Sequence, residues 1–155
     1  MPSIFLCRFA LFMFAATLFG IGCSAPTPYK KVDIGQKETY TGLLTYDLFY
    51  GPPGFGEDTA NDEKEPTYIL HLTTPILFRD TDLVQSDNPI PGNTIGYDTV
   101  RTIHIRADAA TPASSKTLQP LTGKKIKLEC TLYGAHTGHH HAPALIEQVY
   151  SVGRE

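Results

Sequence analysis

The sequence predicts an all-β fold, and three observations lead to this prediction. Five apolar stretches have strand character, and turn-rich segments separate them. Glycine and proline are frequent, at 13 and 12 residues, as expected where short strands alternate with turns. A single short segment, between the third and fourth stretches, favours helix. This order fits a small five-stranded Greek-key barrel of the OB type, in which closure removes exposed sheet edges. An open sandwich is the alternative.

The five expected strands differ in how clearly the sequence marks them. The clearest is Lys124–Tyr133, where Ile126, Leu128, Cys130 and Leu132 alternate with polar side chains, as in a half-buried strand. Cys130 shares the apolar face, so we expect a buried thiol that acts as a small hydrophobic residue. The other expected strands are Thr39–Tyr50, Thr67–Thr73 with a continuation through Ile76–Phe78, Thr99–Arg106 and Ala144–Val152.

The connections carry further expectations. Residues Asp108–Gln119 favour one or two helical turns, but Pro112 and a pair of serines discourage a longer helix. The connection Thr74–Asp98 is long for an unstructured loop, so a short strand or hairpin is expected within it. Gly42 indicates a bend or bulge in the first strand.

Length and charge limit the classes of protein that fit. The 155 residues suit one domain. Lysine and arginine together number 13 against 16 acidic residues, giving a formal net charge of −3. This balance argues against a nucleic-acid partner.

The first residues have the features of an export signal. The apolar run Phe9–Phe19 is too short to cross a bilayer, which needs about 20 residues, but it suits the hydrophobic region of a signal peptide. It leads into Gly20-Ile21-Gly22-Cys23, which resembles the lipobox of bacterial lipoprotein precursors. This resemblance implies cleavage before Cys23 and acylation of its sulfur. Plain secretion and an uncleaved helical anchor are the alternatives.

The expected organisation follows from the signal. Residues 1–22 form a signal peptide, 23–37 a lipidated tether, and 38–155 a single β-barrel domain. We expect the lipid to hold the domain in the cell envelope. Ser24 after the cysteine resembles lipoproteins on the periplasmic face of the outer membrane in Gram-negative bacteria.

Two segments resemble a known family. One is the run Phe49–Glu57, with the sequence FYGPPGFGE. The other combines the start of the fourth expected strand, GKKIKL, with the motif AHTGHHHAPALI from Ala135 to Ile146. Together they are similar to domain of unknown function 4431, found in uncharacterised exported bacterial proteins. The resemblance covers approximately Thr39–Val152 and implies export and β-architecture, without an activity.

The histidine-rich segment is the sharpest candidate site. Four of the six histidines lie between residues 136 and 141, and imidazole is a common ligand for zinc, copper and nickel. In an extended segment His139 and His141 share a face and His140 points away. His136 could complete a three-histidine metal site with His139 and His141, leaving a fourth position for water. Structural locking of a hairpin by imidazoles, or no particular role, are the alternatives.

The expected barrel brings a second segment to the same place. Glu57 and Asp58 belong to an acidic loop between the first two strands, and the histidines lie between the last two. In OB folds these two loops border the usual ligand surface. The predicted binding residues are therefore Glu57, Asp58 and the four clustered histidines, His136, His139, His140 and His141. A solvated loop is the default interpretation of the acidic stretch.

Catalysis finds little support, since no nucleophile elbow, phosphate loop or H-E-x-x-H motif is present in the sequence. We therefore expect a non-enzymatic ligand-binding lipoprotein of the envelope, with a divalent transition metal as the sharpest ligand. The alternative is an interaction lipoprotein that docks an envelope protein or glycan without metal. A metal-dependent hydrolase, with Glu57 or Asp58 as base, is the least favoured.

Overall fold

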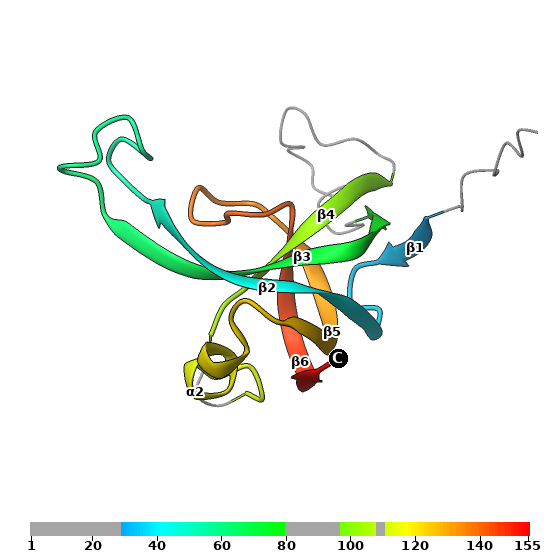
Figure 1. Cartoon of the computed structure of the whole chain (residues 1–155). Helices are drawn as coiled ribbons and strands as arrows, with labels where there is room; N and C mark the ends of the chain where they lie inside the picture. Colours follow the sequence, from blue (N-terminus) through cyan, green and yellow to red (C-terminus); the bar gives the residue numbers. More distant parts are fainter. Residues whose placement is uncertain (1–28, 80–96, 108–110) are drawn as a thin grey trace, which may run out of the picture.

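The computed structural model describes residues 29–79, 97–107 and 111–155. This part of the chain is mostly β-structure, which confirms the all-β prediction (Figure 1). Its strands and helices are β1 (Lys30–Asp33), β2 (Glu38–Tyr50), β3 (Lys64–Arg79), β4 (Asp98–Ile105), α2 (Ser115–Leu118), the 3-10 turn η1 (Gln119–Leu121), β5 (Lys125–Gly134) and β6 (Ala144–Arg154). The predicted signal peptide and Cys23 lie outside the described residues.

The strands form one sheet in the order β1-β3-β2-β5-β6-β4, and β4 pairs with β3 as well. The pairings among β2, β3, β4, β5 and β6 therefore follow a complete circle. Most neighbours are antiparallel, whereas β1 runs parallel to β3 and β4 runs parallel to β6.

The strand count corrects the prediction, because the described sheet has six strands and not five. The extra strand β1 lies within the segment expected as a tether. It has four residues, of which Val32 is fully buried in the core. A strand this short shows no periodicity in the sequence. Its pairing with Ile76–Arg79 of β3 holds it in the sheet.

Strand β3 is longer than expected, since it runs without interruption from Lys64 to Arg79. Its register against β4 shifts between His71 and Ile76, and Pro75 lies within that irregularity. A bulge is a position where a strand tolerates proline. The long connection expected after Thr74 is correspondingly shorter, and residues 80–96, where a further strand or hairpin was expected, lie outside the described residues.

Glycine is required at position 42 because the backbones of β2 and β3 lie close together there, and not because the strand has a bulge. Its pairings with Leu72 of β3 and Ile126 of β5 are continuous with those of its neighbours. A Cβ atom added at this position would overlap the backbone carbonyl of His71. Glycine therefore lets β2 pass close to β3 at this point.

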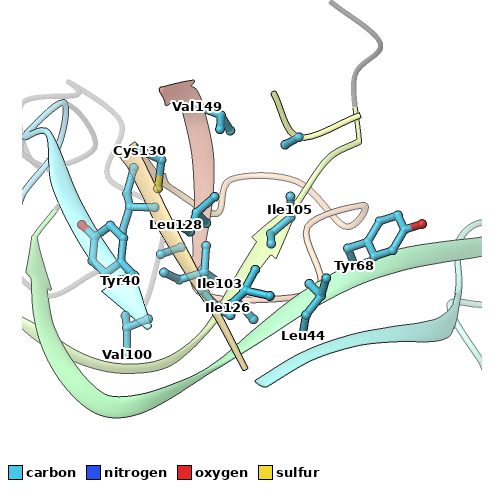
Figure 2. Close-up of a cluster of buried hydrophobic side chains, with 14 of the residues drawn as sticks. Tyr40, Leu44, Tyr68, Val100, Ile103, Ile105, Ile126, Leu128, Cys130 and Val149 are labelled. Carbon is cyan, nitrogen blue, oxygen red and sulfur yellow. The ribbon is translucent and has the colours of Figure 1, made fainter. Parts of the chain in front are cut away.

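The core lies between the inward faces of the strands (Figure 2). Alternate residues of β5 are fully buried, as the sequence pattern predicts, and they include the Cys130 thiol. Burial raises the pKa of that thiol to about 12. Leu118 of the short helix α2 is fully buried and joins the same cluster.

The short helix agrees with the expectation of one or two turns before Gln119. Its N-cap is Ser114, whose hydroxyl accepts a hydrogen bond from the Thr117 backbone N–H at 3.4 Å. In the described ranges, no helix has the length and apolar character needed to span a membrane.

Strands β2 and β3 extend beyond the rest of the sheet. Strand β2 pairs with β5 only as far as Leu43, whereas its pairing with β3 continues to Tyr50 and Lys64. The result is a two-stranded ribbon that projects from the body of the molecule (Figure 1). Tyr46 and Leu48 continue the apolar face of β2 but are each 51% exposed, because the core ends before they are reached.

Candidate functional site

Two loops meet at one end of the sheet, and we call this place the rim. The proline-glycine loop comprises residues 51–63 at the end of the ribbon, and the histidine loop comprises residues 135–143 between β5 and β6. The rings of Phe55 and His139 lie 6.4 Å apart, centroid to centroid, in an edge-on arrangement. A Cβ added at Gly138 would lie 2.7 Å from a ring carbon of Phe55. The two loops are therefore in contact, as the expected topology requires.

Glu65, the second residue of β3, connects the two hairpins. One carboxylate oxygen contacts His139 Nδ1, and the other lies 2.7 Å from His141 Nε2. The side chains of Glu65 and His141 are 15% and 8% exposed. Burial alone would raise the pKa of Glu65, but the hydrogen bonds with His139 and His141 outweigh it and lower the pKa. The carboxylate is thus held ionised between two imidazoles.

Aromatic stacking fixes the orientation of His141. Its ring is nearly parallel to Phe49, at 4.3 Å and 3°, and stacks on His104 at 5.7 Å and 16°. The backbone N–H of His141 donates to His104 Nδ1 at 3.3 Å. A neutral His104 therefore carries its proton on Nε2.

His104 is a buried part of this arrangement. The residue is 6% exposed, and burial, followed by nearby positive groups, lowers its pKa to about 4. Its imidazole is therefore neutral above about pH 4. Sequence alternation alone does not show whether His104 faces the binding surface, because it does not show what covers the outer face of β4.

His136 and His140 form a second pair, and the His140 ring also lies edge-on to His104, with 6.4 Å between the centroids. The His136 N–H donates to His140 Nδ1 at 3.0 Å, and the two rings lie 4.7 Å apart, nearly perpendicular. A turn between them, closed by the His140 N–H on the Thr137 carbonyl at 3.1 Å, explains this pairing. Burial and the neighbouring His136 lower the pKa of His140.

These contacts divide the three predicted metal ligands between two clusters. His139 and His141 reach Glu65, whereas His136 contacts His140. The expected sharing of a face by His139 and His141 agrees with these contacts, but the expected convergence of His136 does not. Over the ranges that the structure describes, no three or more His, Cys, Asp or Glu side chains are arranged to hold a metal ion.

Another acidic residue, Asp62, organises the proline-glycine loop. Its carboxylate accepts backbone N–H groups from Gly54 at 2.6 Å, Gly56 at 2.8 Å and Asp58 at 3.3 Å. Burial would raise the pKa of Asp62, but these three bonds outweigh it and lower the pKa. Gly56 has φ +99°, a conformation that favours glycine. The Asp62 side chain therefore stabilises the loop through hydrogen bonds with backbone groups of the same loop.

Glu57 and Asp58, the acidic residues predicted to bind ligand, are both exposed in this loop. The Asp58 carboxylate accepts a hydrogen bond from the Asn61 side chain at 2.7 Å. The carboxylate that reaches the histidine loop is Glu65, which the sequence placed in the same acidic stretch without distinguishing it. The register of the hairpin would have singled it out, since Glu65 lies opposite Phe49.

The comparisons with known proteins connect this site to one family. The model of the Domain of unknown function (DUF4431) matches residues 102–152, a segment that runs from within β4 into β6 and contains the whole histidine loop. The proline-glycine loop lies before the matched segment. No curated protein and no solved structure matches the chain. Residues 102–152 therefore match the DUF4431 family model, in agreement with the resemblance seen in the histidine motif.

Proposed function

We propose that the chain is a non-enzymatic binding module of the bacterial cell envelope, anchored through a lipid on Cys23, with an OB-type barrel as its body. The circle of pairings supports the barrel. Strands β2-β3-β4-β6-β5 follow one another around it, β4 and β6 run parallel, and the helix lies between β4 and β5. These relations are those of OB folds. The lipobox-like sequence before Cys23 supports the anchor.

The observation that carries the binding role is the contact between the two loops. In OB folds the corresponding loops border the ligand surface. Here Phe55 of one loop contacts the other loop. Glu65 of β3 holds the histidine loop to the ribbon through His139 and His141, and the stack on Phe49 fixes His141. A surface whose side chains are already ordered loses less entropy when a ligand binds. The rim is therefore suited to binding.

A glycan of the envelope fits the rim better than a protein does. Within the described part of the rim, the large exposed apolar side chain is Phe55, at 54% exposure. The His139 ring lies beside it, and Glu57 and Asp58 are exposed in the same loop. Imidazole and carboxylate groups hydrogen-bond to hydroxyl groups. A stable protein interface needs about 800 Å² on each partner and a more apolar centre. One aromatic ring among polar groups is a smaller surface that suits a sugar.

Cosedimentation with purified peptidoglycan tests this proposal. The mature protein is expected to pellet with the glycan in the presence of a chelator. Replacing Phe55 and His139 by alanine is expected to reduce the bound fraction at least fivefold. Tyr150→Ala is a matched control, because this exposed aromatic residue lies on β6 outside the rim. Binding that is absent, or equal in the rim variant and the control, would reject the rim as a glycan surface.

A divalent transition metal is the second candidate ligand, and one observation favours it. His139 and His141 approach the two oxygens of the same carboxylate. The three side chains do not form a metal site as they stand, so an ion would have to replace these hydrogen bonds and draw the two imidazoles and Glu65 together. Titration of the metal-free protein with zinc, copper and nickel tests this. Binding tighter than about micromolar that survives His136→Ala but not His141→Ala would support these ligands. Loss in both variants would favour the three-histidine site instead.

A further inference from the structure

A groove lies between the β2–β3 ribbon and the short helix α2, and we call it the tyrosine groove. One end, with a volume of about 330 Å³, is lined by Tyr46, Tyr68, Ser115, Gln119 and Thr122. The other end, of about 190 Å³, shares the two tyrosines and Ser115 and extends to His104 and Arg106. Figure 1 shows the ribbon passing over α2 on this side of the molecule. The groove therefore has a sheet wall and a helix wall.

The sheet wall is aromatic and partly open to solvent. Tyr46 and Tyr68 are cross-strand partners, and their rings lie 4.6 Å apart at 45°. Tyr68 is 6% exposed, whereas Tyr46 is 51% exposed. Figure 2 shows Tyr68 at the edge of the buried cluster, with its hydroxyl directed away from the other labelled core residues. The pair thus offers a supported aromatic surface to a ligand.

The helix wall presents neutral hydrogen-bonding groups. Ser115 and Thr122 carry hydroxyls, and Gln119 carries an amide with both a donor and an acceptor. Arg106 stands at the far end. Along the described lining of both ends, no Asp, Glu or Lys side chain contributes. The groove therefore combines aromatic faces with uncharged donors and acceptors.

This combination selects a class of ligand. A purely apolar ligand would leave the hydroxyl and amide groups without partners, which is unfavourable. A nucleic acid needs several cations for its phosphates, and the groove has one. A sugar ring has apolar C–H faces for an aromatic wall and hydroxyl or acetamido groups for the opposite wall. A volume of about 330 Å³ is within the range of small-molecule sites, roughly 300–1,000 Å³.

We propose that the tyrosine groove binds an uncharged sugar unit of an envelope glycan, with its ring against Tyr46 and its polar substituents toward Ser115 and Gln119. This inference rests on the proposed glycan-binding function, and it adds a second contact beyond the rim. Tyr46 and Glu65 occupy alternate sides of the ribbon, since Glu65 is opposite Phe49 in the register and Tyr68 is opposite Tyr46. A glycan chain would therefore meet both faces of the ribbon.

The test is titration of the mature protein with chitotetraose, a soluble oligomer of N-acetylglucosamine, followed by calorimetry and amide chemical shifts. The wild type is expected to show saturable binding with shifts at Ser115, Gln119 and Thr122. Tyr46→Ala is expected to weaken binding at least tenfold, and Tyr46→Phe to change it less than threefold, because the ring remains. Tyr150→Ala, at an exposed tyrosine away from the groove, is expected to bind like the wild type.

The result that overturns the groove proposal is unsaturable binding by the wild type, or equal affinity in Tyr46→Ala. Circular dichroism of each variant verifies folding, which the exposure of Tyr46 favours. Peptidoglycan cosedimentation separates the two proposals. If rim variants lose peptidoglycan and Tyr46→Ala retains both ligands, the rim function stands and the groove inference fails. If Tyr46→Ala loses both ligands and rim variants retain peptidoglycan, the groove stands and the rim function fails.

Discussion

The two loops at the rim are ordered in different ways. In the proline-glycine loop, one carboxylate, Asp62, accepts three backbone N–H groups of its own loop. In the histidine loop, order comes from side chains, since His141 stacks between two rings and shares Glu65 with His139. The first loop is closed by its own backbone. The second depends on contacts that it makes with the neighbouring strands.

This difference has an electrostatic consequence. Asp62 and Glu65 both have a lowered pKa. The partners of Asp62 are backbone amides, which do not titrate. The histidine loop instead contacts His104, whose pKa burial lowers from 6.5 to about 4, and contains His140, whose pKa is also lowered. The proline-glycine loop is therefore expected to keep its shape between pH 6.5 and about 4. The contacts of the histidine loop backbone with His104 and His140 are the part of the rim expected to respond to pH.

The largest expected effect on stability comes from Leu145, a buried residue of β6 just after the histidine loop. Leu145 is 1% exposed and lies opposite Tyr133 and His104 in the strand register. Leu145→Ala is expected to lower the free energy of unfolding by about 2–5 kcal/mol, through lost burial and a cavity. Leu43→Ala is the matched control, because Leu43 is 42% exposed and should cost under about 0.5 kcal/mol. Urea unfolding followed by circular dichroism measures both, and equal losses would show that the burial of Leu145 adds no more stability than that of an exposed leucine.

A smaller change in stability is expected when the pH is lowered, because His104 is buried as the neutral imidazole. An unfolded histidine takes up its proton near pH 6.5, whereas the folded pKa of His104 is about 4. The unfolded state therefore binds more protons between these values, and stability rises with pH across this window. We expect the Tm to be maximal above about pH 6.5 and to fall by roughly 4–8 °C on acidification to pH 5.

Thermal unfolding of His104→Gln at the same pH values checks the assignment. The variant is expected to show a flatter dependence between pH 7 and 5, because the glutamine side chain does not titrate and its amide oxygen can still accept the His141 N–H. His140, whose pKa is also lowered, would leave part of the slope in place. An unchanged slope in the variant would assign the pH dependence to other groups.

The sequence predicts most of the strands, because residues buried on one face of a strand alternate with exposed polar residues. In β5 every second residue is buried, so the alternation of Ile126 and Leu128 with lysine and glutamate was decisive. Strand β1 was missed because four residues are too few to show a period. The exposure of Tyr46 was also not predictable, since it depends on where the neighbouring strands end.

The sequence predicts which residue types form the site, but it does not predict which side chains contact one another. The two unusual loops were expected at one rim, and Phe55 and His139 do lie together there. Glu65, however, resembles its acidic neighbours in sequence, and only the register of the β2–β3 hairpin places it opposite Phe49. The separation of His136 from His139 depends on a turn within the loop, which residue spacing alone does not reveal.

A smaller change, Glu65→Gln, weakens the contact between β3 and the histidine loop. The amide keeps the shape of the side chain but removes the charge that His139 and His141 share. We expect a loss of about 1 kcal/mol in unfolding free energy at pH 7, as for a hydrogen bond to a charged group with partial exposure. The lowered pKa of Glu65 means that this contribution is present above its ordinary value of 4.5 and lost as the pH falls through the lower folded value.

The control for this change is Glu63→Gln, at an exposed residue of the proline-glycine loop. It is expected to alter the unfolding free energy by under about 0.5 kcal/mol. Urea titrations at pH 7 and pH 3 measure both variants against the wild type. If Glu65→Gln matched Glu63→Gln at pH 7, the carboxylate would not stabilise the histidine loop against β3, and the contrast between the two loops would fail.

The smallest effect on stability is expected at the direct contact between the loops. A Cβ at Gly138 would come within 2.7 Å of the Phe55 ring, which is 54% exposed and free to move outward. Gly138→Ala is therefore expected to change stability by under about 0.5 kcal/mol while moving Phe55 away from His139. NMR cross-peaks between these two rings should weaken, and the amide shifts of Gly54 and Gly56, which Asp62 holds, should stay unchanged. Shifts that spread to those two amides would mean that the proline-glycine loop needs its neighbour after all, because a loop closed on its own backbone has no reason to respond.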